Sequence, residues 1–208
     1  MNVAPHIFWL LSRAAGSVAL VTASVSVGVG LLVGMRLAVP GRRNLVPIHE
    51  ATALVTLAFT ALHAFALLGD GFVHLGLAGI AVPFAGGYRP LWTALGIVSA
   101  YGLAVLGISY YARDRIGTAR WRRLHRLTAG FWVLAIAHTV GTGTDAGSAW
   151  FLASCGIVVV PAFALMVERW LPHGHAEAPA PSRKAWRTAE TGQAANDAQS
   201  SSGAIEAG

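Results

Sequence analysis

The sequence is poor in charge, cysteine and lysine, and each shortage excludes a class of protein. Only 12% of its 208 residues are charged, whereas a soluble domain carries about 25%. The single cysteine, Cys155, excludes an internal disulfide and a cysteine-based metal cluster. Lysine occurs once, at Lys184, so the net charge of +6 comes almost entirely from arginine. These arginines lie in short clusters between apolar runs, as membrane orientation requires, and so do not indicate nucleic-acid binding.

The long apolar runs predict an all-α polytopic membrane protein, a bundle of about five transmembrane helices in a lipid bilayer. Hydrophobic residues make up 55% of the chain, and a helix needs about 20 of them in a row to cross a bilayer. A further apolar segment, about 72–84, is too short to cross and is expected at the membrane interface. The five expected spans are about 8–33, 48–68, 91–111, 121–140 and 148–170.

A change of composition at Pro172 divides the chain into two parts. Residues 1–171 are expected to form the membrane domain, and residues 172–208 a disordered tail. The arginine-rich loops near 36–43 and 113–126 share one side of the membrane, which the positive-inside rule makes cytoplasmic. The sequence therefore predicts a multi-pass protein of the cell membrane, with its N-terminus outside and its C-terminus in the cytoplasm.

Two of the expected spans carry histidine pairs with nearly equal spacing. His49 and His63 are 14 residues apart, and His125 and His138 are 13 apart. A histidine inside a bilayer is costly and indicates function, and imidazole is a common axial ligand of heme iron. Both spans run in the same direction, so each contributes one histidine at an inner level and one at an outer level, about 20 Å away. This arrangement of four histidines at two levels predicts two b-type hemes, each between two histidines.

The 13-residue spacing does not fit a regular helix. Thirteen residues fall about 140° short of whole turns, so a straight α-helix would point His125 and His138 in different directions. We therefore expect a departure from i→i−4 bonding between His125 and His138, with Thr128 to Phe131 as the favoured place and a π-bulge near Gly130 as one form.

The sequence resembles the ferric reductase-like transmembrane family. This family includes ferric-chelate reductases, NADPH oxidases and the heme-binding membrane subunit of the bacterial methionine sulfoxide reductase system. The resemblance rests on the two histidine pairs, on Trp-Arg-Arg-Leu-His-Arg-Leu at 121–127 and on Tyr-Arg-Pro at 88–90. It covers about residues 10–170. It implies that the inner histidines, His49 and His125, hold a cytoplasmic heme and that the outer pair holds a second one.

The resemblance also implies neighbours for the hemes. Phe131, near the midpoint of the second pair, would be the aromatic side chain between them, and its plain alternative is a packing phenylalanine. Heme propionates are anionic, so Arg13 and Arg89 are candidate partners at the outer level and Arg126 at the inner level. Anchoring at the membrane interface is the alternative for all three arginines.

The implied function is electron transfer across the bilayer by a membrane diheme cytochrome b, an electron-transfer subunit of an oxidoreductase. No Gly-x-Gly-x-x-Gly-like segment follows the last span, so the donor is expected to be a separate flavoprotein reductase or a membrane quinol. The outer acceptor stays undetermined. One alternative is a subunit that supplies electrons to a periplasmic methionine sulfoxide reductase. A third possibility, from another class, is a heme-free membrane scaffold or transporter.

Overall fold

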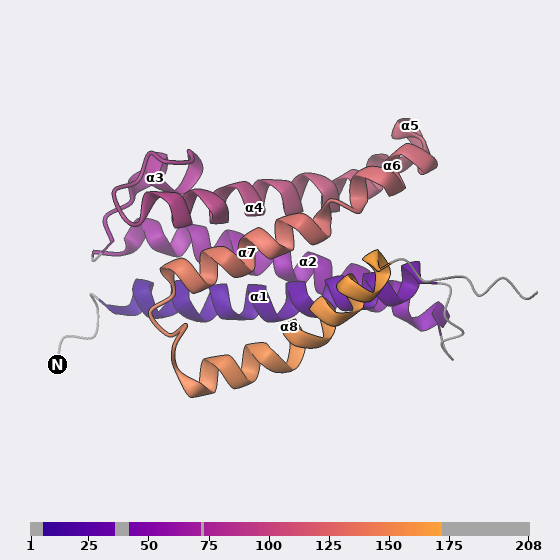
Figure 1. Cartoon of the computed structure of the whole chain (residues 1–208). Coiled ribbons are helices and arrows are strands. Elements are labelled where there is room, and N and C mark those ends of the chain that lie inside the picture. Colours follow the sequence, from indigo (N-terminus) through magenta and orange to yellow (C-terminus); the bar gives the residue numbers. More distant parts are fainter. Residues whose placement is uncertain (1–5, 36–41, 72, 172–208) are drawn as a thin grey trace, which may run out of the picture. The chain divides into compact units, whose positions relative to one another are not determined.

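The computed structural model describes residues 6–35, 42–71 and 73–171. The chain divides into two units, 1–171 and 172–208, and the expected tail lies outside the described residues. The described residues form helices and connecting segments, without a strand among them (Figure 1). The predicted fold class, an all-α membrane bundle, is confirmed.

Four helices are long and apolar enough to cross a membrane. Their outer faces carry exposed large apolar side chains, for example Val105 and Ile157, as contact with lipid requires. A short helix, α3 (Gly76–Ala81), lies within the expected interfacial segment. The four long helices are α1 (Ile7–Gly34), α2 (Arg42–Ala66), α4 (Pro90–Ile108) and α8 (Ala149–Trp170). Single turns η2 (Leu67–Gly69) and η3 (Ser109–Ala112) extend α2 and α4, and α5 (Arg113–Ile116) follows η3.

The second span begins earlier than the sequence predicted. We expected a loop through Pro47, but α2 begins at Arg42 and contains that proline. Pro47 is the sixth residue of α2, so it removes one i→i−4 backbone donor in the second turn of the helix. His49 consequently lies within an established helix rather than at its first turn.

The expected span 121–140 is two helices rather than one. These are α6 (Thr118–His125) and α7 (Thr128–Thr142), and α7, with 15 residues, is too short to count among the four long helices. α7 nevertheless packs along α4, while α1 packs along α2 and against α8 (Figure 1).

The break between the two helices directly follows His125. The N–H of Leu127 bonds to the carbonyl three residues earlier (2.9 Å), and so does that of Ala129 (3.3 Å). Such i→i−3 bonds tighten a helix into a 3₁₀ turn. The predicted departure from i→i−4 bonding is present, but it is a tightening just before Thr128 rather than a π-bulge at Gly130.

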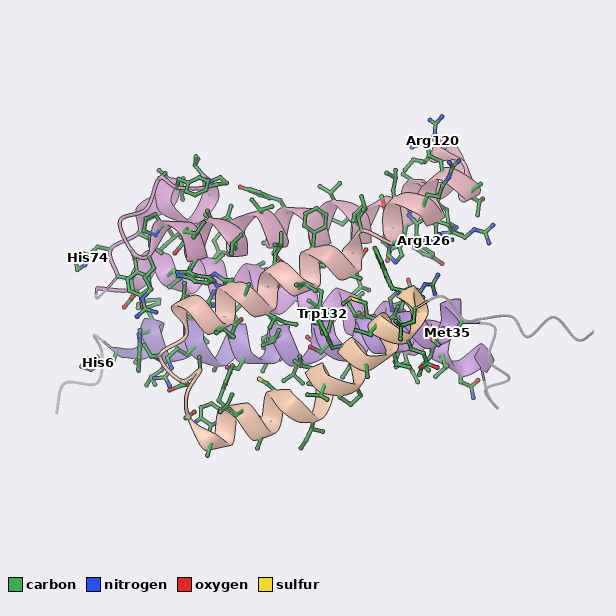
Figure 2. The ribbon with its side chains drawn as sticks, in the orientation of Figure 1. His6, Met35, His74, Arg120, Arg126 and Trp132 are labelled. Atoms are coloured by element: carbon green, nitrogen blue, oxygen red, sulfur yellow. The ribbon has the colours of Figure 1, made fainter. Side chains whose placement is uncertain are left out.

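The core centres on Trp132 of α7, which is 0% exposed (Figure 2). Its indole Nε1 donates to the hydroxyl of Ser24 on α1 (3.0 Å). That hydroxyl in turn donates to the Leu20 carbonyl (2.7 Å). Away from water an indole N–H needs an acceptor, so this bond fixes the position of α7 against α1.

We predict that Trp132→Phe lowers the free energy of unfolding by about 1–2 kcal/mol, because it removes the bond to Ser24 and leaves a small void. A double-mutant cycle with Ser24→Ala should give a coupling of about 0.6–1.7 kcal/mol, the range of interhelical bonds in membranes. Unfolding by SDS in mixed micelles would measure both values. Trp170→Phe is the matched control because Trp170 is 80% exposed, and an equal loss there would contradict the argument.

Candidate functional site

The structure brings the four histidines together in two pairs. His49 of α2 lies beside His125 of α6, with ring centres 6.0 Å apart and planes at 87°. His63 of α2 lies beside His138 of α7, with ring centres 6.3 Å apart and planes at 77°. These are the pairs that the helix directions predict.

The ring spacing within each pair leaves room for one metal ion. An imidazole nitrogen binds a metal at about 2 Å. Two imidazoles that share a metal therefore have centres roughly 6 Å apart, once about 1 Å from nitrogen to ring centre is added on each side. Both measured spacings, 6.0 and 6.3 Å, match this value.

Backbone carbonyls orient three of the four rings. Nδ1 of His63 donates to the carbonyl of Ser12 (2.8 Å), and Nδ1 of His49 to that of Ser26 (2.8 Å). Nδ1 of His138 donates to the Trp92 carbonyl (2.9 Å). A carbonyl can only accept, so Nδ1 carries the proton in each ring. The lone pair is therefore on Nε2, and that nitrogen is free to bind a metal.

Helix α1 holds both histidines of α2 by the same arrangement, repeated after 14 residues. The hydroxyls of Ser12 and Ser26 each donate to the backbone carbonyl of the facing histidine (both 3.3 Å). Four residues further along, Gly16 and Gly30 face the rings themselves. A Cβ at Gly16 would lie 3.0 Å from Nδ1 of His63, and a Cβ at Gly30 would lie 2.9 Å from Cε1 of His49. Glycine is therefore required where α1 approaches the two rings.

Helix α4 holds His138 in a similar way. The Trp92 carbonyl accepts from Nδ1, and Gly96, one turn later, faces the ring, so that a Cβ there would lie 2.5 Å from Nδ1. His125 is the exception among the four. Its buried Nδ1 lies near the backbone carbonyl of Leu106 on α4, but without normal hydrogen-bonding geometry. The ring is stacked on Trp121 instead, with centres 4.8 Å apart and planes at 22°.

Each pair lines its own cavity. The outer pair, His63 and His138, lines one of about 250 Å³, and the inner pair lines one of about 50 Å³. Three residues line both cavities and so lie between the two levels: Ala23, Thr56 and Leu103.

The three predicted arginines differ in whether they line one of these cavities. Arg13 lines the outer cavity, forms an ion pair with Asp145 and lies over the Trp9 ring (4.1 Å). Arg89 lies outside the cavity lining and donates to the Gly141 carbonyl at the end of α7. Arg126 is exposed, in the break between α6 and α7, and does not line the inner cavity.

The structure places the Phe131 side chain on the side of α7 that faces α4. Its ring packs against Gly102 of α4, and it lines neither cavity. Its backbone carbonyl accepts from the Ser99 hydroxyl (2.8 Å). Its role between two hemes stays a prediction, because a midpoint in sequence sets the level of a residue but not the face of the helix on which it lies.

The donor set fits heme iron better than a bare metal ion. Among the described residues, no group of three or more His, Cys, Asp or Glu side chains is placed to hold a metal. Zinc sites use three or four protein ligands, so two histidines are too few. Heme iron already has four nitrogens from its macrocycle and takes its axial ligands from side chains such as histidine. Each pair offers two imidazoles, and at His49, His63 and His138 the Nδ1 bonds leave Nε2 available for such ligation.

Comparison of this chain with protein-family models, curated proteins and solved structures finds no match. The site is therefore argued from its geometry alone.

Sequence reasoning identified the histidines but not the residues that orient them. In the sequence, small residues such as Gly16, Gly30 and Ser26 indicate close helix packing, which does not single out their contacts with the histidines. One signal was available: Ser12-x₃-Gly16 recurs as Ser26-x₃-Gly30, and the 14-residue interval equals that between His49 and His63. The role of Trp92 had no comparable signal, because its carbonyl is the acceptor and every residue has one.

If the His63–His138 pair holds heme, Gly96→Ala should weaken its binding about 10–100-fold, the usual effect of disturbing a residue that orients a metal ligand. The new methyl group would push the His138 ring off the Trp92 carbonyl. Titration of heme-free protein in detergent with heme would measure the affinity. Gly130→Ala is the control, because no heavy atom lies within 4 Å of a Cβ at that helical position. Wild-type affinity in Gly96→Ala would contradict the assigned role.

Proposed function

We propose that this protein is a membrane diheme cytochrome b that passes electrons across the bilayer, from a cytoplasmic or quinol donor to an outer acceptor. The observation that carries the proposal is the spacing of the two histidine pairs, 6.0 and 6.3 Å between ring centres. A heme-free scaffold or transporter would not require two such pairs.

In this proposal the chain's own residues hold and orient the cofactors. His49 and His125 would be the axial ligands at the inner level, and His63 and His138 those at the outer level. The carbonyls of Ser12, Ser26 and Trp92 keep the proton on Nδ1, so that Nε2 keeps its lone pair for the metal. Heme iron, when bound, supplies one-electron chemistry.

The region between the two levels favours passage of electrons over passage of protons. The three residues that line both cavities, Ala23, Thr56 and Leu103, have no titratable group. Proton transfer through a membrane uses chains of Asp, Glu or His side chains. These three residues between the cavities therefore support an electron carrier.

The charge distribution supports the proposed orientation in the cell membrane, with the N-terminus outside and the C-terminus in the cytoplasm. Arg120 and Arg126 lie at the same end of the helices as Met35, whereas His6 and His74 lie at the other end (Figure 2). The arginine-rich end would face the cytoplasm. The exposed arginines there are Arg115, Arg120, Arg122, Arg123 and Arg126.

This orientation places the inner histidine pair near the cytoplasmic surface. A separate flavoprotein reductase would reach the protein at that surface, and a quinol would reach it from the bilayer. The acceptor would meet the outer pair, whose cavity is the larger of the two. A periplasmic methionine sulfoxide reductase is one acceptor of this kind, and a ferric chelate is another.

The reduced-minus-oxidised spectrum of the purified protein tests the proposal. With heme supplied during expression, we expect a b-type signal and two hemes per chain by quantitative heme analysis. Absence of a b-type signal under these conditions would exclude the function. One heme per chain would exclude the diheme form.

The pairing makes a second prediction. His63→Ala and His138→Ala should each remove the same heme and leave the other bound, because both rings belong to one pair. His49→Ala should remove the other heme. Heme content per chain, together with redox titration of the heme that remains, would identify which is lost. If His63→Ala and His138→Ala leave hemes of different potential, the pairing is wrong.

A further inference from the structure

One of the four histidines is oriented by a different interaction from the others. Three of them donate from Nδ1 to a backbone carbonyl, as described above. His125 lacks such a bond of normal geometry, and its nearly parallel stack on Trp121 is the closest ring contact it makes. Its other ring contact is the edge-on approach of His49, at 6.0 Å.

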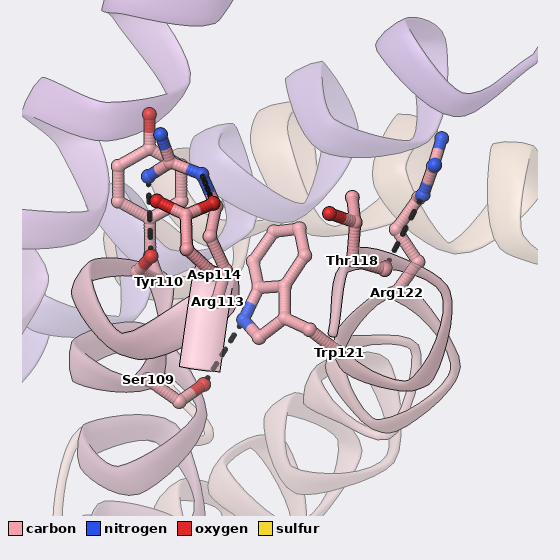
Figure 3. Close-up of polar contacts among 7 residues, drawn as sticks. All are labelled: Ser109, Tyr110, Arg113, Asp114, Thr118, Trp121 and Arg122. Atoms are coloured by element: carbon pink, nitrogen blue, oxygen red, sulfur yellow. Dashed lines mark hydrogen bonds and ion pairs between the residues drawn. The ribbon is translucent and has the colours of Figure 1, made fainter. Parts of the chain in front are cut away.

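Trp121 is itself fixed on several sides. Its Nε1 donates to the hydroxyl of Ser109 (3.1 Å), just beyond the end of α4 (Figure 3). The edge of Tyr110 meets its ring, with centres 5.8 Å apart and planes at 61°. The guanidinium of Arg113 covers Tyr110 at 4.2 Å. The indole is thus a rigid surface joined to α4 rather than a mobile side chain.

The position of His125 explains why it needs such a surface. It is the last residue of α6, immediately before the break, where regular helix bonding ends. Trp121 is four residues earlier and lies on the same face of the helix. A ring at a helix end, whose Nδ1 meets the Leu106 carbonyl only with poor geometry, needs a further contact to hold its plane.

We propose that Trp121 is the positioning residue of the inner site: its indole, anchored by Ser109, holds the His125 ring in the orientation that its pairing with His49 requires. This inference rests on the proposed function. Trp121 does not bind the iron itself and acts only through His125.

The stack also affects the electronic character of the ligand. A hydrogen bond from Nδ1 raises the basicity of a metal-bound imidazole, and a more basic ligand stabilises the oxidised iron. While the ring is stacked on Trp121, Nδ1 of His125 meets the Leu106 carbonyl only with poor hydrogen-bonding geometry. Release of the ring would let Nδ1 bond to a carbonyl or to water, and the midpoint potential of the inner heme would fall.

The test compares Trp121→Leu, Trp121→Phe and the control Trp170→Leu, each measured in the presence of heme. We expect Trp121→Leu to weaken heme binding at the inner level about 10–100-fold and to lower the midpoint potential of that heme. The outer heme and the Trp170→Leu variant should keep wild-type values. Trp121→Phe retains a stacking ring and should restore most of the affinity. Heme titration and redox titration followed at the b-type absorbance measure these quantities.

A second readout does not depend on heme. In heme-free protein, Trp121→Leu should increase the rate at which diethyl pyrocarbonate modifies His125, measured by mass spectrometry, and leave the rate at His138 unchanged. This measurement separates the two proposals: if the wild type binds no heme, the proposed function fails, while the reactivity of His125 still tests the positioning role.

Three outcomes would overturn the inference. These are wild-type inner affinity and potential in Trp121→Leu, an inner potential that does not fall, and equal loss in Trp121→Leu and Trp121→Phe. If Trp121→Leu does not fold, Ser109→Ala replaces it. This variant releases the indole from its anchor, and it should lower the inner potential alone. An unchanged potential in Ser109→Ala would likewise overturn the inference.

Discussion

The close approach of α1 to α2 is the constraint on which the site depends. In hydrocarbon a histidine N–H must find an acceptor within the protein, because no water is present to take its place. The carbonyls of Ser12 and Ser26 can serve only if the two backbones are near each other, and Gly16 and Gly30 permit this. One helix of small residues therefore determines the tautomer and the direction of two imidazoles.

The same need to orient a ring is met differently for the histidines of α6 and α7. His138 uses the Trp92 carbonyl and Gly96, but His125 lies at the end of α6 and uses a tryptophan stack. The break after His125 compensates for a spacing that a straight helix would not tolerate. Its cost is moderate because the Thr128 hydroxyl donates to the carbonyl of His125 (2.6 Å).

The two levels consequently differ in their environment. Each ring of the outer pair has one carbonyl hydrogen bond. Both rings line the larger cavity, which the ion pair of Arg13 with Asp145 also lines. The inner pair has one carbonyl bond and one aromatic stack, and its cavity is smaller. Hydrogen bonding to the ligands and exposure both tune the potential of a bound heme, so two such levels would have different potentials. A difference of this kind gives electron flow a direction.

The sequence by itself determined the helical class, most of the span positions, the levels of the four histidines and the presence of an irregularity after His125. These follow from apolar run length and from a rise of about 1.5 Å per residue, which depend on local sequence alone. Only the tertiary structure decided that Ser12, Ser26 and Trp92 are the acceptors, that Phe131 packs against Gly102 and that Trp121 supports His125. Every residue offers a carbonyl and every helix has several faces, so partners across helices depend on rotation and packing that no single segment encodes.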